Sequence, residues 1–372
     1  MNIKGKVVGD YVIELPLITE INYEEGLKLD KDFFGNWGCS AFSRVLPNND
    51  LVVARSLDLN YSNKAGYIVK TAVKGFNKTV GISYSCFSGD DFDVVKENGV
   101  KEKDLLSILF FTTDILNDKG LYIEGNMRPS QPKITNIKDN SGTNPKGKYS
   151  MSMAALIRFL AERCDSIDSA LKLASEINVY GVAHGPIKWG AALYMADKTG
   201  HYGVLELCDN KLIWNDYALL HTNFYINEEY KDRAIVGTGK GRYDLLKVNL
   251  DSCKSEEDMA KLIDKVKYSR TFDPLTCPFD VRGELCSVDE VAFKDFGGYL
   301  STEAAFDDKN KEVLLNFLIE DGKKTLSKSI KERKDEGVEW HSAYQTICNV
   351  SKGTLKVKFF EDDSLIYTLK AE

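Results

Sequence analysis

One cysteine of this chain has neighbours that could make it a nucleophile. Cys39 follows Gly38, and Arg55 and Asp58 stand 16 and 19 residues downstream of it. A free cysteine has a pKa of about 8.5 and is mostly thiol at neutral pH, so it needs a cation or a base nearby. Arg55 could supply a permanent positive charge, and Asp58 could orient an amine. If the Gly38–Cys39 peptide bond were cut, the freed α-amine of Cys39 could act as the base.

The spacing of these residues also allows a simpler interpretation. Arg55 and Asp58 lie three positions apart on a predicted strand, which places them on opposite faces unless a bulge or the strand end falls at Asp58. Gly38 fits a cleavage site because glycine tolerates backbone strain. On these residues alone, the favoured interpretation is that Cys39 is a buried thiol at a strand end, with Arg55 and Asp58 as a surface ion pair.

The composition narrows the class of protein. The chain has 372 residues, of which 43% are hydrophobic, and a net charge of −7, so it can bury a large core and lacks an overall basic footprint for nucleic acid. It contains no apolar run long enough to span a membrane and no signal-peptide core, which predicts a cytoplasmic protein. The eight cysteines include no Cys-x-x-Cys pair. We therefore expect no metal site, no disulfide framework and no cofactor.

Hydrophobic periodicity predicts strands near both ends of the chain, with helices and a hairpin between them. The expected strands are 6–15, 41–46, 51–57, 66–73, 79–87, 191–196, 202–207, 342–348, 354–360 and 365–369, and the expected helices are 103–116, 150–163, 167–177, 243–250 and 255–268. Residues 128–149 are typical of a long loop, residues 322–337 of a solvated charged helix face, and residues 270–300 are expected to contribute to a pocket. This order favours an α+β domain with antiparallel sheets.

Further motifs resemble those of a known family. They are Asn117-Asp118-Lys119-Gly120-Leu121, Glu124-Gly125-Asn126, Asp197-Lys198-Thr199-Gly200, Val204-Leu205-Glu206, Thr222-Asn223, Gly237-Thr238-Gly239-Lys240-Gly241-Arg242-Tyr243 and the strands of residues 340–360. Together with Cys39, Arg55 and Asp58, this series resembles the choloylglycine hydrolase family. That family includes bile salt hydrolases and penicillin V acylases, and is related to acid ceramidase and acyl-CoA:isopenicillin N acyltransferases.

The resemblance implies a role for each matching residue. Cys39 would be the nucleophile and, through its own amine, the base, while Arg55 and Asp58 would poise it. Asn223 would donate a side-chain N–H to the oxyanion, and Arg242 would stabilise the charge network of the site.

The resemblance leaves two candidates for a second contact to the oxyanion or the substrate. Asn126 is the candidate for it, and Glu124 is the alternative at that place. A polar turn residue with no catalytic role remains an equal interpretation of Asn126.

The resemblance also implies a fold and a division of the chain. The fold would be the four-layer αββα sandwich of N-terminal-nucleophile hydrolases, with two antiparallel sheets. Residues 1–38 would be a leader removed by autocleavage at Gly38–Cys39, and residues 39–372 a single hydrolase domain. In the uncut chain the nitrogen of Cys39 is an amide, so the enzyme would be latent, and the leader could cover the substrate cleft.

The expected reaction is hydrolysis of a linear, non-peptide C–N amide bond in an N-acylated small molecule, through a thioester on Cys39. The expected partner is that small molecule, without nucleic acid or membrane, and a homo-oligomer is left open. Acyl transfer by the same thioester is an alternative. The interval from Asn223 to Arg242 is shorter than in bile salt hydrolases, which places the chain nearer the acyltransferase and ceramidase branches.

A papain-like thiol protease is a competing interpretation of Cys39. The run from Trp37 to Ser43 is superficially similar to the cysteine motif of papain-like proteases, and His184 stands at a suitable interval. Residues 33–36 lack the glutamine that such enzymes need, and Cys39 opens a predicted strand rather than a helix. A non-enzyme interpretation also stands, in which the chain is an uncleaved pseudoenzyme that acts as a binding protein.

Overall fold

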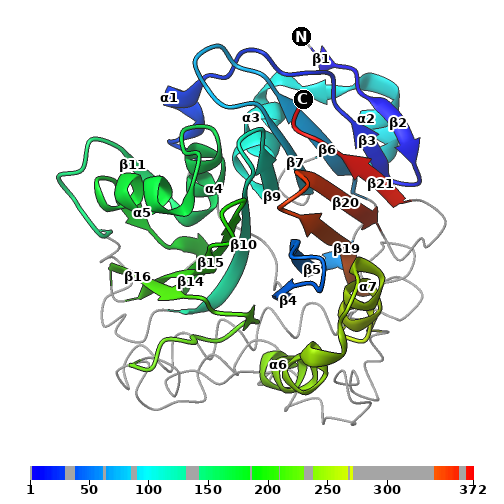
Figure 1. Cartoon of the computed structure of the whole chain (residues 1–372). Coiled ribbons are helices and arrows are strands. Elements are labelled where there is room, and N and C mark those ends of the chain that lie inside the picture. The colour runs from blue at the N-terminus through cyan, green and yellow to red at the C-terminus, as the bar shows by residue number, and fades with distance from the viewer. Residues whose placement is uncertain are drawn as a thin grey trace, which may run out of the picture.

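The computed structural model describes residues 2–29, 38–61, 64–84, 90–130, 142–184, 187–208, 210–229, 238–266, 269–270, 339–359 and 366–372. Within these residues the fold is α+β, with two large sheets and helices beside them (Figure 1). No helix among them is long and apolar enough to cross a membrane.

The larger sheet has ten described strands, and β10 and β14 form its longest contact. Its order is β16 (Lys211–Asp216), β15 (Tyr202–Cys208), β14 (Ile187–Asp197), β10 (Leu121–Ser130), β9 (Thr112–Asn117), β7 (Thr79–Tyr84), β6 (Gly66–Thr71), β3 (Val12–Glu14) and β2 (Lys6–Gly9), with β13 (Val182–His184) paired to β14. Its pairings are antiparallel except for β3 with β6, which is parallel, so this sheet departs from the purely antiparallel one that was expected.

The second sheet has seven described strands and contains both residues of the proposed thiol–guanidinium pair. Its order is β17 (Leu220–His221), β4 (Gly38–Val45), β5 (Leu51–Tyr61), β19 (Glu339–Asn349), β20 (Thr354–Phe359) and β21 (Ile366–Leu369), with β18 (Ser269–Arg270) paired to β19. Two small pairs lie outside the large sheets, β1 (Asn2–Ile3) with β8 (Val100–Lys101) and β11 (Ser150–Ser152) with β12 (Asn178–Tyr180).

The helices pack on the outer sides of these sheets (Figure 1). They are α1 (Tyr23–Gly26), α2 (Phe92–Asn98), α3 (Glu102–Phe110), α4 (Met153–Ala161), α5 (Ile167–Ser175), α6 (Thr238–Asn249), the 3-10 helix η2 (Leu250–Ser252) and α7 (Glu256–Asp264). One hydrophobic cluster joins α3, α4 and α5 to the ten-stranded sheet, and another joins α6 and α7 to β4, β5 and β19. A third contains residues of both sheets.

Strand β5 shows how the sequence pattern produces this packing. Val53 and Leu57 belong to the cluster shared by the two sheets, whereas Val52 and Ala54 belong to the cluster under α6 and α7. Because successive side chains of a strand point to opposite faces, a strand buried on both faces is apolar almost throughout. Arg55 interrupts this apolar run and, by alternation, points to the side of Val53 and Leu57.

Most predicted elements are confirmed, but several boundaries were wrong. The strand expected over residues 6–15 is a hairpin of β2 and β3, and the helix expected from residue 150 begins at Met153, after β11. The helix expected over residues 103–116 ends at Phe110, and Thr112–Asn117 forms β9 instead. Two β-branched threonines begin that strand, and the Thr112 hydroxyl donates to the carbonyl of Leu109 at 2.7 Å, which satisfies the end of the helix. The expected charged face at residues 322–337 and pocket segment at residues 271–300 lie outside the described residues.

The described part of the leader belongs to the core. Strands β2 and β3 extend the ten-stranded sheet, and the backbone of Leu15 and Ile18 bonds to β6 through Ile68 and Lys70, at 3.0 Å each. Helix α1 lies so close to Phe110 that a Cβ on Gly26 would fall 2.0 Å from its ring. Residues 2–29 therefore form part of the same folded unit as the chain beyond Cys39.

This packing predicts a stability effect inside the leader. Leu15 is 2% exposed and Leu17 is 53% exposed. We expect Leu15→Ala to lower the free energy of unfolding by about 2–5 kcal/mol, because it leaves a cavity in the core. Leu17→Ala, two residues away, should change it by less than about 0.5 kcal/mol. Urea unfolding of both variants measures the difference, and equal effects would contradict the packing of the leader.

Candidate active site

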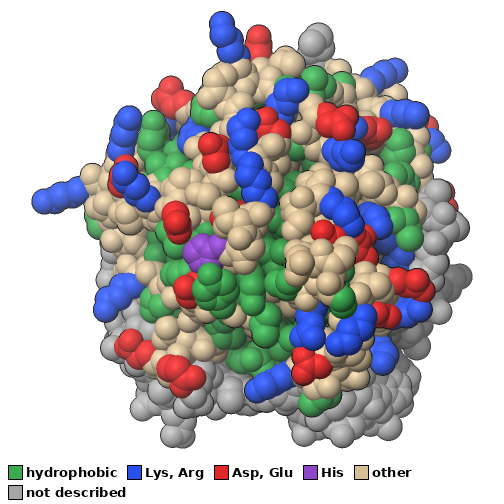
Figure 2. Space-filling model, viewed as in Figure 1, with side chains coloured by type: hydrophobic (Ala, Val, Ile, Leu, Met, Phe, Trp, Pro, Cys, Tyr) green, Lys and Arg blue, Asp and Glu red, His purple; other side chains and the backbone are tan. Residues whose placement is uncertain are grey.

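The start of β4 brings Cys39 beside Arg55. In the antiparallel pairing of β4 with β5, Cys39 faces Leu57 and Ala41 faces Arg55, so Cys39 and Arg55 are diagonal neighbours on one face. The Arg55 Nη2 lies 3.7 Å from the Cys39 Sγ. Both side chains are fully buried. On the face of the molecule that Figure 2 shows, acidic and basic side chains are intermixed around a central band of hydrophobic ones. A cation at this distance favours the thiolate form of a cysteine.

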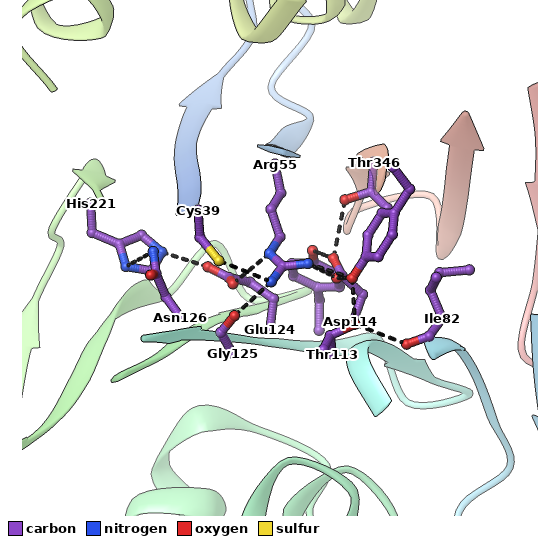
Figure 3. A network of polar contacts seen from close by, with 12 residues as sticks. Cys39, Arg55, Ile82, Thr113, Asp114, Glu124, Gly125, Asn126, His221 and Thr346 are labelled. Carbon is purple, nitrogen blue, oxygen red and sulfur yellow. Dashed lines mark hydrogen bonds and ion pairs between the residues drawn. The ribbon is translucent and has the colours of Figure 1, made fainter. Parts of the chain in front are cut away.

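Arg55 is the centre of a buried network (Figure 3). Its Nε lies 2.8 Å from Oε2 of Glu124, and its Nη2 donates to the carbonyl of Gly125 at 2.6 Å. Its Nη1 pairs with the carboxylate of Asp114 and contacts the hydroxyl of Tyr344. Burial alone disfavours the charged guanidinium, but the neighbouring carboxylates outweigh it, and the pKa of Arg55 is raised well above its ordinary value.

Asp114 is a site residue that the sequence reasoning missed. It lies on β9, and its carboxylate accepts hydrogen bonds from the hydroxyls of Tyr122 at 2.5 Å and Thr346 at 3.1 Å. Burial raises the pKa of Asp114, and the positive charge of Arg55 opposes this rise. The available signal was an acidic residue between Thr112-Thr113 and Ile115-Leu116, in a stretch of β-branched and apolar residues, since a charge in a buried strand needs a partner.

Asn223 holds the main-chain nitrogen of Cys39. Its Oδ1 accepts from that N–H at 2.9 Å and from Nη2 of Arg242 at 2.7 Å. Its Nδ2 donates to Oδ1 of Asn126 at 2.9 Å. Arg242 also donates to the hydroxyl of Ser40 at 2.8 Å, so it connects α6 to β4. The structure thus brings Asn223, Arg242 and Asn126 to the cysteine, as the sequence led us to expect.

Glu124 and Asn126 both reach the site, although they were considered alternatives. They lie two residues apart on β10 and therefore on the same face. Glu124 pairs with Arg55, and Asn126 pairs with Asn223. Each contact belongs to a different part of the site, one beside the sulfur of Cys39 and the other beside its nitrogen.

His221 is a second residue to which the sequence assigned no role in the site. It lies on β17, fully buried, with its ring stacked on Tyr194 at a centroid distance of 5.3 Å. Its Nε2 lies 2.5 Å from Oε1 of Glu124, and its Nδ1 lies 3.3 Å from Nδ2 of Asn126. The side chain of His184, which a papain-like protease would use, lies outside the described side chains.

Asp58 is placed only by its backbone. It lies within β5, opposite Gly38 on one side and Ser342 on the other. The strand continues to Tyr61, so it does not end at Asp58, but the pairing of β5 with β19 shifts register between Ser342 and Tyr344. The side chain of Asp58 lies outside the described side chains, and its role stays a prediction.

This arrangement has the parts that acyl transfer through a thioester needs. A buried thiol has a cation beside its sulfur, and its own nitrogen is held by a side-chain amide. Two asparagine side chains lie next to each other at that nitrogen. Amide N–H groups in such a position can stabilise the negative oxygen of a tetrahedral intermediate.

A family model matches part of the chain. Residues 133–274 match the family model described as acyl-coenzyme A:6-aminopenicillanic acid acyl-transferase. The resemblance expected from the motifs is confirmed. The matched segment contains His221, Asn223 and Arg242, whereas Cys39 and Arg55 precede it.

Solved structures give more distant likenesses. A mutant of conjugated bile acid hydrolase from Clostridium perfringens is 14% identical, with 89% of this chain and 92% of that chain covered and a TM-score of 0.41. A variant of the same enzyme is 12% identical, with 95% and 90% covered and a TM-score of 0.38. No curated protein sequence matches this chain. Its function is therefore inferred from the geometry of the site and from the family match.

The buried charges of the site predict a large effect of removing Arg55. We expect Arg55→Leu to lower the free energy of unfolding by about 3–5 kcal/mol, because it leaves two buried carboxylates without their cation. Arg44→Leu is the matched control, since Arg44 pairs with Asp251, whose side chain is 93% exposed. That change should cost less than about 1 kcal/mol. Denaturant unfolding compares the two, and similar losses would contradict the buried network around Arg55.

Proposed function

We propose that this chain is a cysteine N-terminal-nucleophile enzyme that cleaves the amide C–N bond of an N-acylated small molecule. One observation supports this most directly: the sulfur and the nitrogen of Cys39 are both held, by Arg55 at 3.7 Å and by Asn223 at 2.9 Å. Any buried main-chain N–H needs an acceptor, but here the acceptor is a side-chain amide and the sulfur also has a guanidinium beside it. A nucleophile that uses its own nitrogen as base needs both.

The proposed reaction begins with cleavage between Gly38 and Cys39, which converts the amide nitrogen of Cys39 into an amine. That amine takes the thiol proton, and the thiolate beside Arg55 attacks the substrate carbonyl. The side-chain amides of Asn223 and Asn126 stabilise the oxyanion. The amine of the substrate leaves with the proton, and water then hydrolyses the thioester. Asp58 is proposed to orient the α-amine.

Acyl transfer is the second candidate function. It is supported by the match to a family model that is described as an acyl-transferase. The first half of the reaction is the same, but an amine acceptor captures the thioester in place of water. An acceptor titration separates the two candidates: in a transferase, adding the amine raises product formation and lowers release of the free acid.

We also infer a four-layer αββα arrangement for the domain. The support comes from the three hydrophobic clusters, which lie between helices and the ten-stranded sheet, between the two sheets, and between the seven-stranded sheet and α6–α7. The site residues come from both sheets and lie where the two sheets face each other, in the middle of the four layers.

Replacing Cys39 tests the proposed chemistry. We expect Cys39→Ala to abolish cleavage after Gly38 and to lower turnover of N-acyl amides by about 10⁴-fold or more, because the attacking atom is lost. Cys164→Ala is the matched control. Burial raises the pKa of the Cys164 thiol to about 11, so it is an inert thiol whose loss should leave turnover intact.

The measurement is turnover of a panel of N-acyl amides, bile conjugates, penicillin V and N-acyl lactones, followed by intact mass. An acyl adduct on the peptide that begins with Cys39 supports the proposal. Turnover that survives Cys39→Ala would refute it.

The fate of the leader gives a separate prediction. After cleavage, denaturing mass spectrometry should show two polypeptides, one starting at Met1 and one at Cys39. Native mass spectrometry should show them as one complex, because residues 2–29 are built into the ten-stranded sheet and its core. Loss of residues 1–38 under native conditions would contradict this, and a permanently uncut chain would favour the pseudoenzyme interpretation.

A further inference from the structure

We propose that His221 is a positioning residue that fixes the direction of the side-chain amides at the nitrogen of Cys39. This inference rests on the proposed function, because those amides are the proposed oxyanion donors. It concerns a residue that contacts Asn126 and Glu124 and that the reaction scheme does not use.

The direction of the first amide follows from its partners. The main-chain N–H of Cys39 and the guanidinium of Arg242 can only donate, and both face the same atom of Asn223. That atom is therefore the carbonyl oxygen, and the amide nitrogen of Asn223 faces Asn126. The atom of Asn126 that accepts this hydrogen bond is its own carbonyl oxygen.

The orientation of the Asn126 amide also determines which ring nitrogen of His221 carries the proton. With its oxygen turned to Asn223, Asn126 presents its amide nitrogen to Nδ1 of His221 at 3.3 Å. Nδ1 must accept, so the proton of the neutral ring is on Nε2, which donates to the carboxylate of Glu124 at 2.5 Å. The other oxygen of Glu124 lies 2.8 Å from Nε of Arg55. His221 thus connects the pair of amides to the buried charges.

The surroundings of His221 hold its ring in place. The side chain is fully buried and stacks on Tyr194, with an interplanar angle of 22°. Without the imidazole, the amide nitrogen of Asn126 would lose a buried acceptor, and its side chain could turn over to seek another. An amide nitrogen carries two hydrogens, so Asn223 can donate to Asn126 and to an oxyanion together, but only while Asn126 keeps its oxygen toward it.

Two substitutions of His221 test whether it orients the side-chain amides of Asn126 and Asn223. His221→Gln carries an acceptor and a donor, so it can accept from Asn126 and donate to Glu124. His221→Leu can do neither. We expect His221→Leu to lower kcat by about 10²–10³-fold, the size typical of a lost oxyanion donor, with KM changed by less than about threefold. His221→Gln should bring kcat back to within tenfold of the parent.

The control is His201→Leu. His201 lies in the turn between β14 and β15 of the ten-stranded sheet, whereas His221 lies on β17 of the seven-stranded sheet. It pairs with Asp216, whose side chain is 54% exposed. Its replacement should leave kcat within twofold of the parent. Thermal unfolding of each variant shows whether a loss of kcat accompanies a loss of folding.

The outcomes are distinct. Parent-like kcat in His221→Leu, a loss confined to KM, or equal inactivity of the Gln and Leu variants would each overturn the inference. If His221→Leu does not fold, His221→Gln still decides: kcat within tenfold of the parent supports the positioning role, and a larger loss overturns it. Absence of Cys39-dependent turnover in the parent chain would instead overturn the proposed function itself.

Discussion

The buried guanidinium of Arg55 is the interaction on which the rest of the site depends. A charge without access to water is costly unless carboxylates and other hydrogen-bonding groups surround it. Arg55 comes from β5 of the seven-stranded sheet, whereas Asp114 and Glu124 come from β9 and β10 of the ten-stranded sheet. The ion pairs therefore join the two sheets at the place where the sulfur of Cys39 lies.

A consequence is that stability and reactivity are coupled in this site. The same guanidinium that favours a thiolate is needed to compensate two buried carboxylates. The guanidinium also contacts the carboxylates of Asp114 and Glu124, the hydroxyl of Tyr344 and the carbonyl of Gly125, which limits how strongly it can act on the sulfur. Under the proposed function, the interior could hold a reactive cysteine because tyrosine hydroxyls bond to Asp114 and His221 bonds to Glu124, which reduces the cost of their buried negative charge.

The sequence predicted the contacts between site residues that are close in the chain better than the contacts between distant segments. The turn near residues 47–50 makes β4 and β5 a hairpin, so the closeness of Cys39 and Arg55 followed from short-range pattern. Asp114 and His221 reach the cysteine through strand pairings between distant segments, and no local pattern encodes the register of such pairings. Motif resemblance identified Asn223 and Arg242 because they stand in a recognisable order, which the family match over residues 133–274 supports. The end of α3 was misplaced because the apolar residues of β9 continue the helical pattern.

The packing of the leader bears on how latency would arise. The described leader residues extend a sheet edge and fill part of the core, so their contacts do not depend on an intact bond after Gly38. Cleavage would change the covalent structure more than the fold. What it changes directly is the nitrogen of Cys39, which is an amide N–H donor to Asn223 before the cut and an amine with its own lone pair after it. The difference between an inactive and an active site would then lie in the chemistry of one atom, which Asn223 can hold in either state because both forms donate a hydrogen bond.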